Sequence, residues 1–193
     1  VTAHERSLHY ASDAYPEPAY YLQNLESGER KQILKGYQEP YRFKFDESQQ
    51  GFYFVSVSSS DPRWAGAGMS ELYYYDLSSN QVDKVNLNHD WGLAGYQLSR
   101  NTVVASLANG ATNKIATYQK SGKTWKKSML DFGDQEEHVG ILSISENGKK
   151  MAFVHSTTQQ LPRYFIADLT ANRNGFFVQN KKEFVELNKK LKS

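Results

Sequence analysis

The sequence contains no cysteine among its 193 residues, and this absence excludes several kinds of chemistry. Disulfides, thiolate nucleophiles, and zinc or iron–sulfur sites held by cysteine are all ruled out. No apolar run approaches the ~20 residues that a membrane-spanning helix needs. The formal charge of +2 is too small to indicate a nucleic-acid-binding surface, because Lys and Arg are scattered along the chain. We expect neither a nucleic-acid partner nor a membrane span, and the compartment stays open between a bacterial periplasm and a cytoplasm.

Aromatic residues are plentiful, and their pattern indicates an all-β protein. The 13 Tyr, 10 Phe and 3 Trp favour strands, since aromatic side chains fit pleated surfaces. Short apolar runs alternate with turn-like segments such as "SSN" and "ENGK". The predicted strands are 41–45, 52–57, 71–77, 81–87, 95–99, 102–108, 113–119, 124–132, 139–145, 150–156, 163–169 and 176–179.

One phrase occurs twice in the chain. "EPAYYLQNL" (17–25) returns as "LPRYFIADL" (161–169), 144 positions later and without a gap. The ends of four predicted strands divide this interval: Asn24, Asp76, Gln119 and Asp168 lie 52, 43 and 49 residues apart. Four strands in ~40–50 residues is the spacing of propeller blades. The two phrases are therefore predicted to be equivalent strands of repeated units.

The predicted fold is an all-β propeller of four-stranded antiparallel blades, with about four blades across residues 1–193. The expected division is a partial blade at 1–35, then blades at about 36–92, 93–137 and 138–193. We expect the chain to be part of a larger propeller, since an open array would expose apolar blade faces. Two alternatives remain: the tail "EFVEL" (183–187) could close a four-bladed ring, or the repeat could arise by chance in a β-sandwich.

The blade phrases resemble a known family. "ENGKK" before "MAFVHS", followed by "PRYFIADLT", is similar to blades of the prolyl-oligopeptidase-type serine peptidases, in the dipeptidyl-peptidase and acylaminoacyl-peptidase branch. "ELYYYDLSSNQ" and "AYYLQNLESGERKQI" fit the same pattern, and "FVELNKKL" is similar to the phrase with which these propellers often finish. TolB-like propellers share this blade pattern. The chain departs from the family in "TANRNGFFVQNKKEFV", which is longer than usual.

The resemblance implies a non-catalytic role for this chain. In this family the nucleophile lies in a G-x-S-x-G turn of an α/β-hydrolase domain, and no such motif occurs here. Ser70 in "GAGMSEL" follows Gly68 by two residues, but Leu72 stands where the second glycine belongs. The implied function is to gate the access of peptides to a hydrolase domain of the same parent protein. No catalytic residue and no cofactor is predicted.

The candidate contact residues lie in the long connections between predicted strands, because long loops on a rigid scaffold usually carry function. "SSSDPRWAGAGMS", "LNHDWGLAG" and "DFGDQEEHVG" are expected on one face, and the tight turns on the other. Contact with peptide, or with the hydrolase domain, is predicted for the following residues: Arg63, Trp64, His89, Asp90, Trp91, Glu136, Glu137 and His138.

Each of these residues also has a structural interpretation. Trp64 can anchor its loop, and Trp91 is expected to pack at a blade junction. Glu136 and Glu137 resemble the paired glutamates with which dipeptidyl peptidases hold a free amino terminus, but a solvated acidic loop is the default. His89 and His138 each adjoin a carboxylate without a third ligand at a recognisable spacing, so no metal site is predicted.

Two other function classes remain open at this point. A stand-alone TolB-like propeller would bind a protein partner and would have no hydrolase domain beside it. A carbohydrate-active propeller would need several Asp-box turns, whereas "YQKSGKTW" (118–125) matches that motif only at its end and has Lys120 where the aspartate belongs.

Overall fold

The computed structural model describes the chain in segments: residues 2–4, 18–59, 68–100, 102–122, 124–130, 132, 138–169, 177–179 and 189–190. Its strands form four separate antiparallel sheets that follow one another along the sequence. We number these sheets 1 to 4. In the described residues, no helix is long and apolar enough to cross a membrane.

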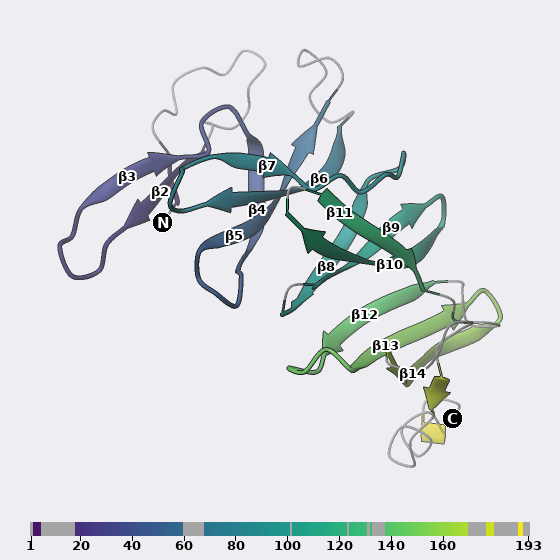
Figure 1. The fold of residues 1–193 in the computed structure, drawn as a ribbon. Coiled ribbons are helices and arrows are strands. Elements are labelled where there is room, and N and C mark those ends of the chain that lie inside the picture. The colour runs from purple at the N-terminus through teal and green to yellow at the C-terminus, as the bar shows by residue number, and fades with distance from the viewer. Residues whose placement is uncertain are drawn as a thin grey trace.

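Each sheet pairs consecutive strands, so neighbours in the sequence are neighbours in space. Sheet 1 contains β1 (Thr2–His4), β2 (Pro18–Gln23) and β3 (Arg30–Ile33). Sheet 2 contains β4 (Gln38–Phe45), β5 (Gly51–Ser58), β6 (Met69–Asp76) and β7 (Val82–Lys84). Sheet 3 contains β8 (Leu93–Ser99), β9 (Thr102–Asn109), β10 (Thr112–Ser121) and β11 (Thr124–Met129). Sheet 4 contains β12 (Val139–Ile144), β13 (Lys150–Thr157), β14 (Gln160–Asp168) and β15 (Phe177–Gln179). Figure 1 shows the four sheets following an arc from sheet 1 to sheet 4.

The repeated phrase corresponds to equivalent strands, because β2 and β14 each precede the final strand of their sheet. The polar residue next to the end of the phrase, Asn24 in the first copy, stabilises the turn that follows the strand. Asn24 Oδ1 accepts hydrogen bonds from the backbone N–H groups of residues 26 and 27, at 2.8 and 3.0 Å. Asp76, at the end of β6, accepts from the N–H groups of residues 78 and 79, at 2.9 and 2.8 Å. These side chains replace missing backbone partners in the turn, so Asn and Asp recur at this position.

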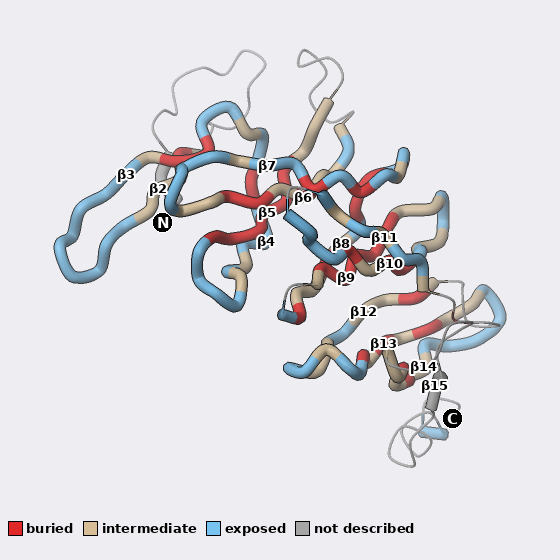
Figure 2. The backbone as a smooth tube through the Cα atoms, viewed as in Figure 1, coloured by how far each residue is buried: buried red, intermediate tan, exposed pale blue. Residues whose placement is uncertain are grey.

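Alternate residues of one strand enter different hydrophobic clusters. In β5, Tyr53 and Val55 pack toward sheet 3, whereas Phe52 and Phe54 pack toward sheet 1. Both faces of the strand are buried, which explains why "FYFVSV" lacks the alternation of apolar and polar residues typical of a half-exposed strand. Figure 2 shows the buried segments in the strands of sheets 2 and 3, and exposed residues at the turns.

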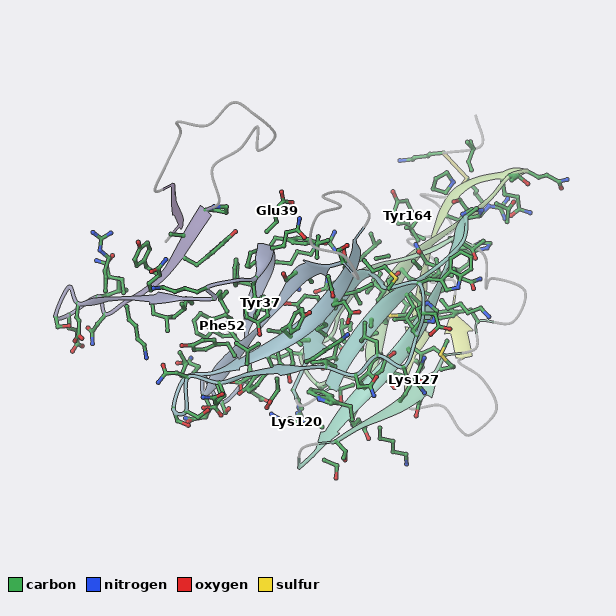
Figure 3. The ribbon with its side chains drawn as sticks, turned by 90° about the horizontal axis from the view of Figure 1, so that it is seen from above. Tyr37, Glu39, Phe52, Lys120, Lys127 and Tyr164 are labelled. Carbon is green, nitrogen blue, oxygen red and sulfur yellow. The ribbon has the colours of Figure 1, made fainter. Side chains whose placement is uncertain are left out.

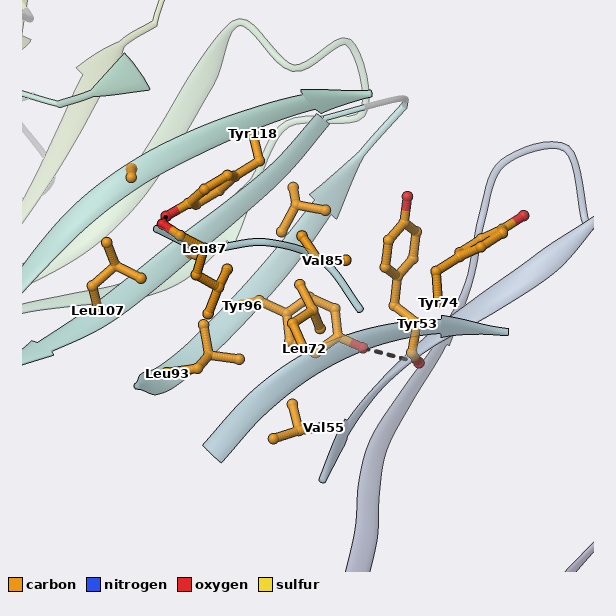
Figure 4. Close-up of a cluster of buried hydrophobic side chains, with 13 residues drawn as sticks. Tyr53, Val55, Leu72, Tyr74, Val85, Leu87, Leu93, Tyr96, Leu107 and Tyr118 are labelled. Carbon is orange, nitrogen blue, oxygen red and sulfur yellow. Dashed lines mark hydrogen bonds between the residues drawn. The ribbon is translucent and has the colours of Figure 1, made fainter. Parts of the chain in front are cut away.

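Sheets 2 and 3 share the largest of the three clusters. Tyr118 is fully buried there, and its hydroxyl donates to Leu87 O at 2.7 Å. Tyr96 donates to Tyr53 O across the junction, at 3.2 Å (Figure 4). Two further clusters join sheet 1 to sheet 2 and sheet 3 to sheet 4. Four sheets packed in succession are incompatible with a two-layer sandwich, which is the alternative that the sequence had left open.

Several strand boundaries differ from the prediction. β7 ends at Lys84 and not at residue 87; the backbone N–H of Val85 still donates to Leu72 O at 2.9 Å, and the side chains of Val85 and Leu87 lie in the cluster between sheets 2 and 3. β11 ends at Met129, and β14 begins at Gln160, earlier than predicted. The first strand of sheet 1 is Thr2–His4, and the tail at 183–187 lies outside the described residues.

Candidate functional site

The connection between β7 and β8, residues 85–92, carries three of the predicted contact residues. Its backbone is held to sheet 3 at successive positions. Leu87 O accepts the hydroxyl of Tyr118, and Asn88 O accepts Lys127 Nζ at 2.8 Å (Lys127 is labelled in Figure 3). At the end of the connection, the backbone N–H of Ala108 donates to Gly92 O at 3.1 Å. This long connection is therefore fixed by the sheet beneath it.

His89 has a structural partner. Its half-buried ring places Nε2 within hydrogen-bond distance of Ala108 O, and a carbonyl can only accept, so Nε2 carries the proton. Within the described ranges no three His, Asp or Glu side chains gather into a possible metal site. The geometry gives His89 the role of fastening its loop to the end of β9.

Asp90 and Trp91 are presented to solvent by the fastened loop. Trp91 is 62% exposed, so the prediction that it packs at a blade junction is wrong. The reason is that Val85 and Leu87 fill the junction between sheets 2 and 3, which leaves the ring outside. Burial lowers the pKa of Lys127, and the carboxylate of Asp90 partly offsets that effect. The loop thus offers a flat aromatic ring and a carboxylate on a fixed backbone.

The other predicted residues are distributed differently. Arg63, Trp64, Glu136 and Glu137 lie outside the described residues, so their contact roles stay predictions. His138 is half-buried directly before β12, where its backbone has the left-handed φ of 49°. The structure thus places His89, Asp90 and Trp91 on one loop, and His138 on the connection to a different sheet.

A second group of polar residues, which the sequence analysis did not select, joins β4 to β8. Arg42 Nη1 donates to Ala94 O at 2.8 Å, and the hydroxyl of Tyr96 donates back to Arg42 O. Two residues further along β4, Lys44 Nζ donates to Gln97 Oε1. Both strands are the first in their sheets, and we call Arg42 and Lys44 the β4 cation pair.

The environment of the β4 cation pair is unusual for two positive charges. Burial lowers the pKa of Lys44, and the neighbouring Arg42 lowers it further. The Lys44 ammonium also lies 5.5 Å from the ring centroid of Tyr96. Arg42 is exposed, and Lys44 is half-buried. A signal was present in the sequence, because neither 41–45 nor 93–99 contains an acidic residue, but the two stretches had to be brought together first.

Comparison with known proteins identifies the fold. The chain matches no family model and no curated protein sequence. Among solved structures it is similar to TolB from Acinetobacter baumannii, with a TM-score of 0.55 and 22% identity over 88% of this chain. The chain has a β-propeller fold. The chain is also similar to a prolyl endopeptidase, with a TM-score of 0.54 and 17% identity over 86% of this chain. That enzyme is one of two studied for the role of inter-domain dynamics in catalysis and specificity.

The β-propeller fold confirms the fold class predicted from the repeat, and the four sheets are its blades. Both similar proteins are larger, because the chain spans 40% of the TolB chain and 26% of the prolyl endopeptidase. In a propeller the blades surround a central axis. The loop that carries Trp91 is followed directly by β8, whose Ala94 O accepts the hydrogen bond from Arg42.

Proposed function

We propose that this chain is a non-catalytic, polypeptide-binding propeller whose contact surface includes the loop 85–92. The observation that carries this proposal is Trp91, an aromatic ring that is 62% exposed on a backbone fixed by hydrogen bonds. Exposed aromatic rings on rigid supports supply contact area at a small entropic cost, which is why Trp and Tyr are frequent anchors of interfaces.

The first form of this function is the propeller of a serine peptidase. Here the chain would limit the access of peptides to an α/β-hydrolase domain of the same parent protein, and the loops would contact that domain or the peptide. The sequence resemblance of the blade phrases and the likeness to a prolyl endopeptidase support it. The absence of a G-x-S-x-G motif from the chain agrees with a non-catalytic role.

The second form is a TolB-like module that binds a separate protein. Its support is the likeness to TolB, which has the higher identity, 22% against 17% for the prolyl endopeptidase. In this form no hydrolase domain is needed, and the same loop would contact the partner. The two forms differ in what lies against Trp91, and this difference makes them separable by experiment.

The test is photo-crosslinking from position 91 in the parent protein as it is produced in cells. A benzoylphenylalanine at position 91 should give crosslinks that mass spectrometry can assign, and Leu25 is the control position. Leu25 is 93% exposed in the turn after β2, away from the loop 85–92. Crosslinks to a hydrolase domain of the same chain support the first form, and crosslinks to another folded protein support the second. Equal yields from positions 91 and 25 would overturn the proposal.

A further inference from the structure

In the part of the chain that the structure describes, the β4 cation pair has no anionic partner. Within the described ranges neither Arg42 nor Lys44 takes part in an ion pair, whereas Lys84 in β7 pairs with Glu71 at 2.6 Å. The hydrogen bonds of the pair go to neutral acceptors, a backbone carbonyl and an amide oxygen. Lys44 is partly removed from water beside the charge of the exposed Arg42, and without a compensating charge this costs stability. An arrangement that is unfavourable in the free protein is expected where a ligand supplies the missing charge.

The carboxylates closest in sequence are directed elsewhere. The charge of Glu39, on the same strand, contributes to the raised pKa of Tyr20, which belongs to sheet 1. Asp46, directly after β4, accepts the hydroxyl of Tyr74 at 2.6 Å and the backbone N–H of residue 50 at 3.0 Å. Neither is among the groups that shift the pKa of Lys44. These two acids, the neighbours of the pair on its own strand and directly after it, therefore do not neutralise the pair.

The position of the Arg42 guanidinium leaves donors available. Nη1 is bonded to Ala94 O, and the remaining N–H groups have no other hydrogen bond among the described residues. Gly95 makes this position possible, because a Cβ atom on residue 95 would lie 2.7 Å from Nη1. Arg42 lies at an irregularity of β4, with the left-handed φ of 54°, and its side chain and that of Lys44 both reach residues of β8. A planar anion between them could accept two N–H bonds from the guanidinium and one from the ammonium.

We propose that Arg42 and Lys44, positioned by Gln97 and Gly95, form a binding site for a carboxylate of a polypeptide ligand. The site lies on the first strands of sheets 2 and 3 and uses no residue of the loop 85–92. It goes beyond the proposed function, because it names the group that is recognised. The carboxylate can come from a C-terminus or from an Asp or Glu side chain, and both present the same two oxygen atoms.

The comparison with Lys127 shows why the pair differs from a structural lysine. Lys127 also donates to a neutral acceptor, Asn88 O, and burial also lowers its pKa. In contrast to Lys44, it has a carboxylate nearby, since Asp90 offsets the effect of burial. Lys127 also fastens the loop 85–92, so the control variant is made at Lys120, whose ammonium lies 4.1 Å from the ring centroid of Tyr74: replacing it removes one charge but no proposed ligand contact.

The experiment is an NMR titration with three octapeptides of Gly, Ala and Ser that carry acetylated N-termini. One has a free C-terminus, one is amidated, and one is amidated and contains a single Glu. The signals of Arg42 Nε–H and of the Gln97 side-chain amide report binding at the site. The free acid or the Glu peptide, or both, should bind at least about tenfold more tightly than the amide, the effect expected of a charge-assisted hydrogen bond. The two acidic peptides distinguish a C-terminal source from a side-chain source.

Variants separate binding from a merely structural role. Arg42→Gln and Lys44→Met should each abolish the preference for the acid, and Lys120→Met should keep it. Should Arg42→Gln not fold, Lys44→Gln replaces it, with thermal unfolding as the check. Equal affinity for the acidic and the amidated peptides, no binding of either acid, or saturation by inorganic phosphate alone would refute the proposal. The crosslinking from position 91 does not depend on this site, so failure of one proposal is distinguishable from failure of the other.

Discussion

Replacing Phe54 by alanine tests whether the junctions between sheets hold the fold together. Phe54 is fully buried between sheets 1 and 2, and its ring lies 5.4 Å from those of Tyr37 and Tyr73. Truncating such a side chain removes apolar burial and leaves a cavity, at a cost of about 3–5 kcal/mol. The matched control is Phe45→Ala, whose ring contacts Phe52 at 5.6 Å but is 59% exposed. We expect the control to cost less than about 1 kcal/mol.

Urea unfolding, followed by the fluorescence of the tryptophans, measures this difference. With a slope of about 2 kcal/mol per molar urea, Phe54→Ala should lower the midpoint by about 2 M and Phe45→Ala by less than about 0.5 M. Because a loss of ~4 kcal/mol approaches the whole stability of some domains, Phe54→Leu serves as a milder variant. Equal midpoint shifts for Phe54→Ala and Phe45→Ala would refute the reasoning. A ring buried between two sheets would then stabilise the fold no more than a largely exposed ring at the end of a strand.

Three further predictions follow from single contacts. Tyr118→Phe should lower the free energy of unfolding by about 1–2 kcal/mol in urea titrations, because it leaves Leu87 O buried without the 2.7 Å hydrogen bond. An unchanged midpoint would mean that water reaches this carbonyl. Burial raises the pKa of Tyr118 from 10.0 to about 12, so the folded state retains the proton more strongly. The stabilisation that comes from protonated Tyr118 is fully present below pH 10 and is lost as the pH rises from 10 toward 12. The temperature of thermal unfolding should therefore fall in this pH range, and it should fall less steeply in Tyr118→Phe. Gly51→Ala should destabilise the fold by about 1–3 kcal/mol in calorimetry, because its Cβ would lie 2.3 Å from Tyr75 O. Gly140→Ala, whose Cβ would lie 3.0 Å from the side-chain atom Val154 Cγ1, should lose less, and equal losses would show that the close contact with the backbone does not decide.

The sequence was sufficient to predict the fold, because the relevant signals are local and repeated. Asn24 and Asp76 mark the turns after equivalent strands, and turn chemistry depends only on the next few residues. The boundaries that were missed depend on distant contacts. Val85 and Leu87 have strand-like sequence and their side chains fill the space against sheet 3, but the paired residues of β7 end at Lys84, and nothing near them in the sequence specifies that end.

The candidate sites were only partly predictable for the same reason. The loop 85–92 was selected by its length and composition, but the exposure of Trp91 depends on which side chains already occupy the junction. In the sequence, Arg42 and Lys44 occupy positions where strands commonly carry polar side chains. Their significance appears only when β8, about 50 residues further along, brings two stretches without acidic residues together.

Because the hydrophobic clusters lie between the sheets, no blade has a core of its own. Each blade obtains its stability from its immediate neighbours, as the units of a solenoid do. Exposed turns such as residues 24–29 contribute little to this shared packing, so insertions there can accumulate during evolution while the blades stay intact. A scaffold built in this way can acquire new binding partners by changing only its loops.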